Sequence, residues 1–231
     1  MGGGSLSVSP AFDMSLIDSK KIIPCYFYVM VRTADQEARR RQVAEALLTV
    51  IARDGLAGAK LASVAAEAGT SIGLVQSYFR SKSDLLRFGI EYMYARAAER
   101  IAEAPRGTTI RQTLISIMET LLPLDEARRG ELSVWLAFIP VTLTDPAMRA
   151  LHHHNTERLL SGLTDGFARA QQTGELPSRL DPREEASALV ALTDGISVHC
   201  LATGGDFDAA RARRLLTNHL DRLFTEGSDS P

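Results

Sequence analysis

The chain has 231 residues, of which 45% are hydrophobic and 23% charged, a composition typical of a folded globular protein rather than a disordered one. Its formal net charge of -2 excludes a uniformly polybasic coat for nucleic acid, and its two cysteines exclude a disulfide framework or a four-cysteine zinc site. Aromatic residues make up only 6%, and abundant alanine and leucine favour helices over strands.

The first 33 residues show no regular hydrophobic period and are rich in glycine and serine. An apolar run at 22–31 follows two lysines, as in a signal peptide, but Pro24 interrupts it and no cleavage site of small residues follows. A membrane span needs about 20 apolar residues, twice this length. We therefore predict a disordered leader over 1–33, and the alternative is that translation starts at Met30.

Helical periodicity begins behind this leader. Between 34 and 53, apolar residues recur at three- and four-residue steps, which indicates an amphipathic helix that ends at Gly55. Three arginines at 39–41 fit either a solvated face or a patch that faces phosphates. Residues 31–90 carry nine Lys and Arg against six Asp and Glu, whereas residues 91–231 carry 15 against 20. This basic excess in the N-terminal part hints at contact with a polyanion.

Two short helices follow. The first, predicted over 61–69, is stopped by Gly69, and either Thr70 or Ser71 can cap a second helix over 72–79. Two short helices joined by a tight turn with a glycine are typical of a helix-turn-helix unit. The second helix of such a unit can lie in the major groove of DNA with its N-terminal residues on base edges.

The rest of the chain has the pattern of amphipathic helices separated by prolines and glycines, without an alternating strand pattern or a repeat of fixed period. We expect these helices at 83–103, 109–122, 125–143, 146–173, 182–202 and 208–224, with a frayed tail at 227–231. The predicted fold is all-α. It comprises a three-helix DNA-binding unit with a helix-turn-helix over 34–82, followed by a larger helical domain for ligand binding and dimerisation over 83–226.

The letters V-A-A-E-A-G-T-S-I-G at 64–73 and Y-F-R-S-K-S-D-L-L at 78–86 supply Ala-Gly, Ser, Gly, Tyr-Phe, Lys and Leu at characteristic spacing. On these residues the chain resembles the TetR family of one-component repressors over about 45 positions. The resemblance implies a cytoplasmic homodimer that binds a palindromic double-stranded DNA operator and is released by a small-molecule effector. It implies no cofactor and no membrane.

The resemblance also assigns candidate DNA-binding residues. Two of them depart from the family pattern, since Gln76 replaces a common tyrosine and Lys60 replaces a threonine that meets a phosphate. Lys60 can serve as a point charge, and Gln76 can pair with a base edge such as adenine, so we expect a changed operator rather than lost activity. The candidates are Lys60, Thr70, Ser71, Tyr78 and Lys82 toward phosphates, and Ile72, Gly73, Gln76 and Ser77 toward the groove.

The letters E-L-S-V-W-L-A-F at 131–138 and L-T-D-G-I at 192–196 resemble the ligand-binding half of the BetI-type subgroup, which implies dimerisation through the last two helices. Independently, the leucine stripes of these helices could form a four-helix bundle between two copies, or could pack inside one chain. The candidate interface residues are Leu189, Leu192, Ile196, Leu216, Leu220 and Leu223.

Control by a small molecule requires a largely apolar cavity of several hundred Å³. Large side chains on the helices of the second domain are candidates for its lining, although each also fits a plain core role. They are Met93, Met118, Trp135, Phe138 and Phe167. Three carboxylates could meet a cationic ligand or be solvated, namely Glu119, Glu131 and Asp194.

Two motifs point to other chemistry. Residues 69–73 fit the G-x-S-x-G elbow of serine hydrolases, but that elbow follows a strand, and a helix precedes it in this sequence. The three histidines at 152–154 cannot all face one metal ion, because adjacent helix residues are about 100° apart. We predict neither an enzyme nor a metal site. The alternative to a repressor is a dimeric small-molecule-binding helical protein without sequence-specific DNA recognition, which Gln76 would permit.

Overall fold

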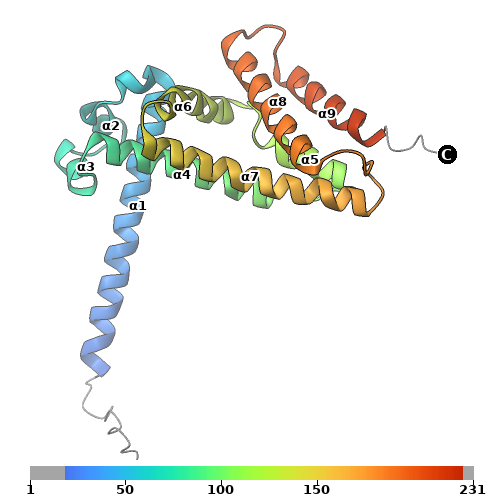
Figure 1. Cartoon of the computed structure of the whole chain (residues 1–231). Coiled ribbons are helices and arrows are strands. Elements are labelled where there is room, and N and C mark those ends of the chain that lie inside the picture. The colour runs from blue at the N-terminus through green and yellow to red at the C-terminus, as the bar shows by residue number, and fades with distance from the viewer. Residues whose placement is uncertain (1–18, 226–231) are drawn as a thin grey trace, which may run out of the picture. The chain divides into compact units, whose positions relative to one another are not determined.

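The structure, a computed structural model, describes residues 19–225 and the side chains of residues 36–224. Every element in this part of the chain is an α-helix, which confirms the predicted all-α class (Figure 1). The helices are α1 (Ser19–Gly58), α2 (Leu61–Glu67), α3 (Ile72–Tyr78), α4 (Lys82–Glu103), α5 (Ile110–Glu119), α6 (Glu126–Thr142), α7 (Pro146–Gln172), α8 (Pro182–Ala202) and α9 (Ala209–Thr225). None of these described helices is both long and apolar enough to cross a membrane.

Helix α1 differs most from its prediction. The chain divides into two units, Met1–Arg41 and Gln42–Pro231, and α1 contributes residues to both. Residues 19–33 are helical, although an irregular leader was predicted for them; residues 1–18 lie outside the described part. Between Pro24 and Gly55 the sequence has no glycine or proline, so no helix breaker separates residues 25–33 from the predicted helix behind them. At Gly55, where the prediction ended the helix, φ is 70° and α1 is kinked.

The turn between α2 and α3 is built as the sequence indicates. Gly69 has a φ of 62°, a left-handed conformation that glycine adopts without strain. Ser71 then caps α3, because its Oγ accepts a hydrogen bond from the Leu74 backbone N–H at 3.1 Å. The side-chain amide of Gln42 donates to the Ala68 carbonyl at 2.9 Å and so ties the turn to α1.

The first of two hydrophobic clusters joins the helix-turn-helix to the neighbouring helices. It contains buried residues of α1, α2, α3 and α4, with Val134 and Phe138 of α6 and Met148 of α7. Gly89 of α4 marks its tightest contact, since a Cβ at this position would lie 2.6 Å from Cδ2 of Leu47. The Tyr92 hydroxyl of α4 also donates to the Glu45 carboxylate of α1 at 2.6 Å. Helix α4 therefore packs closely on the C-terminal part of α1.

The second cluster comprises buried residues of α5, α7, α8 and α9. Helix α8 packs along α7 and against α9, and α9 packs on α5. The starts of α6, α7 and α8 are defined by aspartates. Asp125, Asp145 and Asp181 each accept hydrogen bonds from backbone N–H groups in the first turn of the helix that follows. The ends of all helices after α1 lie within three residues of the predicted ends.

Candidate nucleic-acid interface and ligand cavity

Helix α3 buries one side and exposes the other. Val75 is fully buried on the inner side, whereas Gly73, Gln76 and Ser77 are exposed, and Ile72 is 44% exposed. Ile72 and Leu143 are the exposed large hydrophobic residues of the described part of the chain. The four residues predicted to face a DNA groove thus share the outward face of α3.

The five predicted phosphate contacts lie at helix ends around α3. Lys60 precedes α2, Lys82 begins α4, and both are exposed, as is Ser71. Thr70 and Tyr78 are half-buried, so part of each side chain packs on the protein. The structure therefore brings these residues and the outward face of α3 into one helix-turn-helix unit.

Gly73 has no structural reason to be a glycine. Its φ is not positive, and the nearest heavy atom to an added Cβ is the Ser71 Oγ at 4.0 Å. A glycine inside a helix costs roughly 1 kcal/mol of stability relative to alanine. The α3 backbone at Gly73 is therefore open to the outside, with no side chain of the protein covering it.

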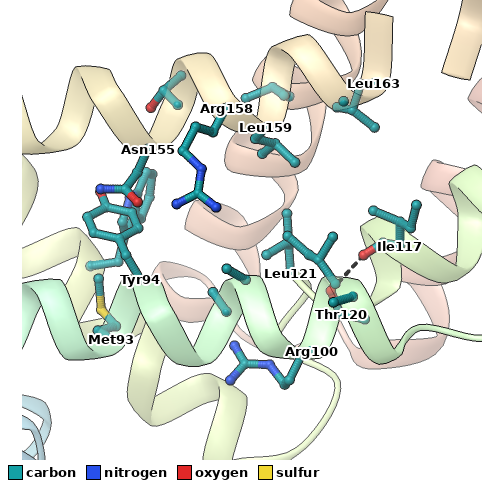
Figure 2. A pocket seen from close by; sticks show the side chains of 18 of the residues that line it. Met93, Tyr94, Arg100, Ile117, Thr120, Leu121, Asn155, Arg158, Leu159 and Leu163 are labelled. Atoms are coloured by element: carbon teal, nitrogen blue, oxygen red, sulfur yellow. Dashed lines mark hydrogen bonds between the residues drawn. The ribbon is translucent and has the colours of Figure 1, made fainter. Parts of the chain in front are cut away.

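A cavity of about 490 Å³ lies among α4, α5, α6, α7 and α8. Figure 2 shows side chains of α4 and α7 facing each other across it, with Tyr94 and Asn155 near one end and Ile117 and Leu163 near the other. Its middle is lined by apolar side chains such as Leu121 and Leu159. The volume suits a small organic molecule.

Two of the five predicted lining residues, Met93 and Trp135, face this cavity. The other three do not: Met118, Phe138 and Phe167 are at most 2% exposed and belong to the two hydrophobic clusters. Large side chains that point to the middle of a helical bundle fill the core, so the cavity is left to their neighbours. The carboxylates Glu131 and Asp194 line the cavity, whereas Glu119 instead forms an ion pair with Arg213 at 3.4 Å.

One end of the cavity, here termed the aromatic end, comprises Tyr94, Trp135, His152 and Asp194. The Tyr94 hydroxyl hydrogen bonds to Nδ1 of His152 at 2.7 Å and also interacts with the Trp135 side chain. The donor and acceptor roles in this bond depend on the tautomer of His152, and the nearby Trp135 indole N–H can only donate. The Tyr94 and His152 rings are thereby held together at one end of the cavity.

The charges at the aromatic end follow from burial. Burial raises the pKa of Tyr94 far above its usual value, and the negative charge of Asp194 adds to that rise. Burial also lowers the pKa of His152, and the neighbouring His153 lowers it further, so the imidazole is neutral at pH 7. Partial desolvation raises the pKa of Asp194 to about 6, although its side chain remains open to the cavity. At neutral pH the aromatic end thus carries the single negative charge of Asp194.

The opposite charge lies further along the same cavity, at the arginine end, which comprises Arg100, Glu131 and Arg158. Arg100 and Glu131 form an ion pair of 2.6 Å, and Arg96 reaches the same carboxylate at 3.5 Å. The Arg100 Nε is buried and has no hydrogen-bond partner within the described part of the chain. Arg158 projects from α7 toward the cavity without an ion pair to any described residue (Figure 2).

Sequence patterns contain little signal for most of these cavity residues. Tyr94, Asn155 and Arg158 are polar residues on amphipathic helices, where the pattern alone predicts a solvated face. The local hint that such a residue lines a cavity is its position at the edge of the apolar stripe, as with Arg100 beside Ile101. These side chains face the same cavity because α4 and α7 pack side by side, and a local sequence pattern carries no information about that packing.

The two motifs that suggested other chemistry have structural roles. The serine of the G-x-S-x-G match is Ser71, the cap of α3, and it follows a helix and a turn. Of the three consecutive histidines, His152 lines the cavity whereas His153 and His154 are exposed. Among residues that the structure describes, no group of three or more His, Cys, Asp or Glu could hold a metal ion.

The predicted interface residues are mostly interior residues. Leu189, Leu216 and Leu220 are fully buried and Ile196 is 3% exposed, all within the second cluster, so these four cannot form an outer face. Leu192 and Leu223 are half-buried beside them. The stripe predicted to join two copies instead packs α8 and α9 against α7 and α5. The exposed side of α8 carries smaller residues, Ala188, Ala191 and Gly195.

Two family profiles match the chain. The profile described as bacterial regulatory proteins of the tetR family matches residues 44–87, which contain the helix-turn-helix. The profile described as the C-terminal part of BetI-type transcriptional repressors matches residues 110–225, which contribute much of the cavity wall.

Individual relatives agree with these profiles. The HTH-type transcriptional regulator BetI of Paraburkholderia phymatum is 33% identical over 204 residues, which are 86% of this chain and 100% of the relative. The crystal structure of a transcriptional regulator from Rhodococcus sp. Rha1 matches with a TM-score of 0.74 at 26% identity, covering 83% of this chain and 99% of that chain. A regulator from Saccharomonospora viridis in complex with choline matches with a TM-score of 0.75 at 26% identity, covering 80% and 96%.

Proposed function

The chain belongs to the TetR family of helix-turn-helix transcriptional repressors, with a BetI-type effector-binding domain, and from this premise we propose how it reads DNA and what it senses. Members of this family are regulators and not enzymes. In the cytoplasm, two copies would each place α3 in the major groove, about one helical turn apart on a palindromic operator. The small exposed residues of α8 are suited to close contact between the two copies.

The observation that carries the DNA-reading role is the outward face of α3. Ile72 is exposed without cover, and Gly73 lacks a side chain that the protein itself would accommodate. Both features are explained if this face meets a groove, where Gly73 allows the backbone to approach and Gln76 reaches a base edge. Lys60 and Lys82 would fix the register through phosphates.

The experiment is fluorescence anisotropy with labelled DNA from upstream of the gene. We expect binding that an unlabelled copy of the same fragment displaces far better than a scrambled one, and a complex that contains two chains. Failure to bind any such fragment at low ionic strength would instead favour the alternative, a small-molecule-binding helical protein without DNA recognition.

The effector we propose is an organic cation with a quaternary or tertiary ammonium group. The aromatic end offers Trp135 and Tyr94 as ring faces and Asp194 as a negative charge, which together suit such a group. His152 is held neutral by burial and adds no repulsion. The related regulator from Saccharomonospora viridis was solved with choline, which carries this group.

A matched pair of compounds tests this effector class. Choline and its uncharged isostere 3,3-dimethylbutan-1-ol have the same shape, and only choline carries the positive charge. We expect choline to raise the melting temperature of the protein and to lower its affinity for DNA, because a ligand stabilises the state that it binds better. Equal shifts by the two compounds would contradict recognition of the charge.

Helix α4 offers the physical link between the cavity and the DNA. Near its N-terminus Gly89 packs on Leu47 of α1, and one turn later Met93 and Tyr94 line the cavity. A ligand that displaces Tyr94 would therefore act on the same rigid helix that supports the helix-turn-helix. It would shift the equilibrium only by the difference in its affinity for the two arrangements.

A further inference from the structure

The cavity is larger than an ammonium group requires, and its charges are separated. Its volume of about 490 Å³ lies in the range of sites for drug-sized ligands. Asp194 provides a negative charge at the aromatic end. At the arginine end, Arg96 and Arg100 share the carboxylate of Glu131, and Arg158 adds another positive charge. A ligand held only at the aromatic end would leave Arg158, which is exposed, without an anionic partner from the ligand.

The spacing between the two ends follows from helix geometry. Tyr94 and Arg100 are six residues apart on α4, and His152 and Arg158 are six residues apart on α7. Since an α-helix rises 1.5 Å per residue, the Cα atom of Arg100 lies about 9 Å along α4 from that of Tyr94, and the Cα atom of Arg158 lies about 9 Å along α7 from that of His152. In Figure 2 both arginines lie on the same side of Tyr94, toward Ile117 and Leu163.

Both arginines retain unused hydrogen-bonding capacity. The Arg100 Nε is buried without a partner, although the rest of its guanidinium is engaged by Glu131. A buried donor without an acceptor costs free energy, and an acceptor brought by a ligand would remove that cost. Arg158 forms no ion pair within the described residues, and its guanidinium points into the space between α7 and α4 (Figure 2).

We propose that the effector is a zwitterion, whose ammonium group binds at the aromatic end and whose carboxylate or phosphate group binds Arg158 and Arg100, which stand six residues further along α7 and α4. An apolar linker joins the two groups and packs on Leu121 and Leu159. This inference rests on the proposed cation site and adds a second, anionic group to the ligand.

Calorimetry with the full-length protein tests the proposal. The probes are 6-(trimethylammonio)hexanoate, its methyl ester, and 4-(trimethylammonio)butyl phosphate. All three carry the ammonium group, but the ester lacks the anionic group that the other two have. We expect the better of the two anionic probes to bind about tenfold more tightly than the ester, as an added charge-assisted hydrogen-bond pair allows. Which of these two binds more tightly decides between carboxylate and phosphate.

Variants test whether Arg158 causes the tighter binding of the anionic probes. In Arg158→Gln we expect the preference to fall to about twofold, while the ester binds at least as tightly as before because it loses only repulsion from the guanidinium. Arg158→Lys should retain part of the preference because the charge remains. Arg214→Gln is the matched control, since it removes one exposed positive charge on α9 outside the cavity. Melting curves of the variants check that they fold.

The outcomes separate the two proposals. If the ester binds and neither anionic probe binds more tightly, the zwitterion is overturned and the cation site stands. The zwitterion is also overturned if Arg158→Gln leaves the preference intact. If none of the three probes binds, both the cation site and the zwitterion are overturned.

Discussion

The candidate DNA-binding residues of α3 and the residues that line the effector cavity differ in where their side chains point. On α3 the residues proposed to bind DNA point outward, and only Val75 is buried beneath them. The cavity residues point inward from five helices and lie next to the core, as Met93 does in the first cluster. A change on α3 can therefore alter DNA binding with little effect on stability, whereas a change in or beside the cavity alters packing and ligand affinity together.

The largest effect is expected from Gly89→Val, on the α4 segment that leads into the cavity. A Cβ there would lie 2.6 Å from Leu47, which is 1% exposed and cannot move aside. Overpacking of this kind costs about 1–3 kcal/mol. We expect the free energy of unfolding, measured by urea denaturation, to fall by about that amount.

Gly73→Ala is the matched glycine variant on α3. An added Cβ meets nothing closer than 4.0 Å within the chain, and alanine is the better helix former, so stability should rise by about 0.5–1 kcal/mol. DNA affinity should fall, because the methyl group stands between the α3 backbone and the groove. A loss of stability in this variant would contradict the distinction between the two regions.

The next effect concerns the cation site. In Asp194→Asn the aromatic end loses its only negative charge, so choline affinity at pH 7.5 should fall by about tenfold or more. The pH dependence should change as well. Because the pKa of Asp194 is about 6, wild-type affinity should rise between pH 5 and pH 7 and then level off. Titration calorimetry at several pH values measures both effects.

The sign of the stability effect follows from the same pKa. Burial raises the pKa of Asp194 from 3.8 to about 6, so the protonated form is favoured in the folded state. The stability that this preference contributes is present below about pH 4 and is lost as the pH rises through 6. Asp194→Asn should lack this loss. The lowered pKa of His152 should stay as it is, because burial and His153 cause it, whereas the raised pKa of Tyr94 should fall slightly once the negative charge of Asp194 is gone. An identical pH profile in the variant would show that another group titrates.

The helix-turn-helix could be predicted because its determinants are local. The positive φ of Gly69, the cap at Ser71 and the burial of Val75 all depend on residues within a few positions of each other. The same locality places the predicted groove residues on one face of α3. Helix ends elsewhere were also predictable, since capping aspartates and breakers lie in the sequence itself.

The cavity and the surface of α8 could not be predicted in the same way. The periodicity that identifies an apolar stripe is the same whether the stripe faces its own core or a second copy, which is why Leu216 and Leu220 were assigned to an interface. Likewise, hydrophobicity does not distinguish Met118, which is buried, from Ile117, which lines the cavity one residue earlier. These distinctions depend on how separate helices pack.

The smallest effect is expected from single phosphate contacts at the edge of the helix-turn-helix. Lys82 is exposed at the start of α4, so Lys82→Ala should leave the melting temperature unchanged. It should weaken binding to all DNA sequences similarly and reduce the slope of log affinity against log salt by about one. Gln76→Ala is the contrasting variant on the outward face of α3, because it would remove the proposed base contact: it should relax sequence preference and leave the slope unchanged. If Lys82→Ala changed preference among operators and kept the slope, Lys82 would contact a base edge rather than the backbone.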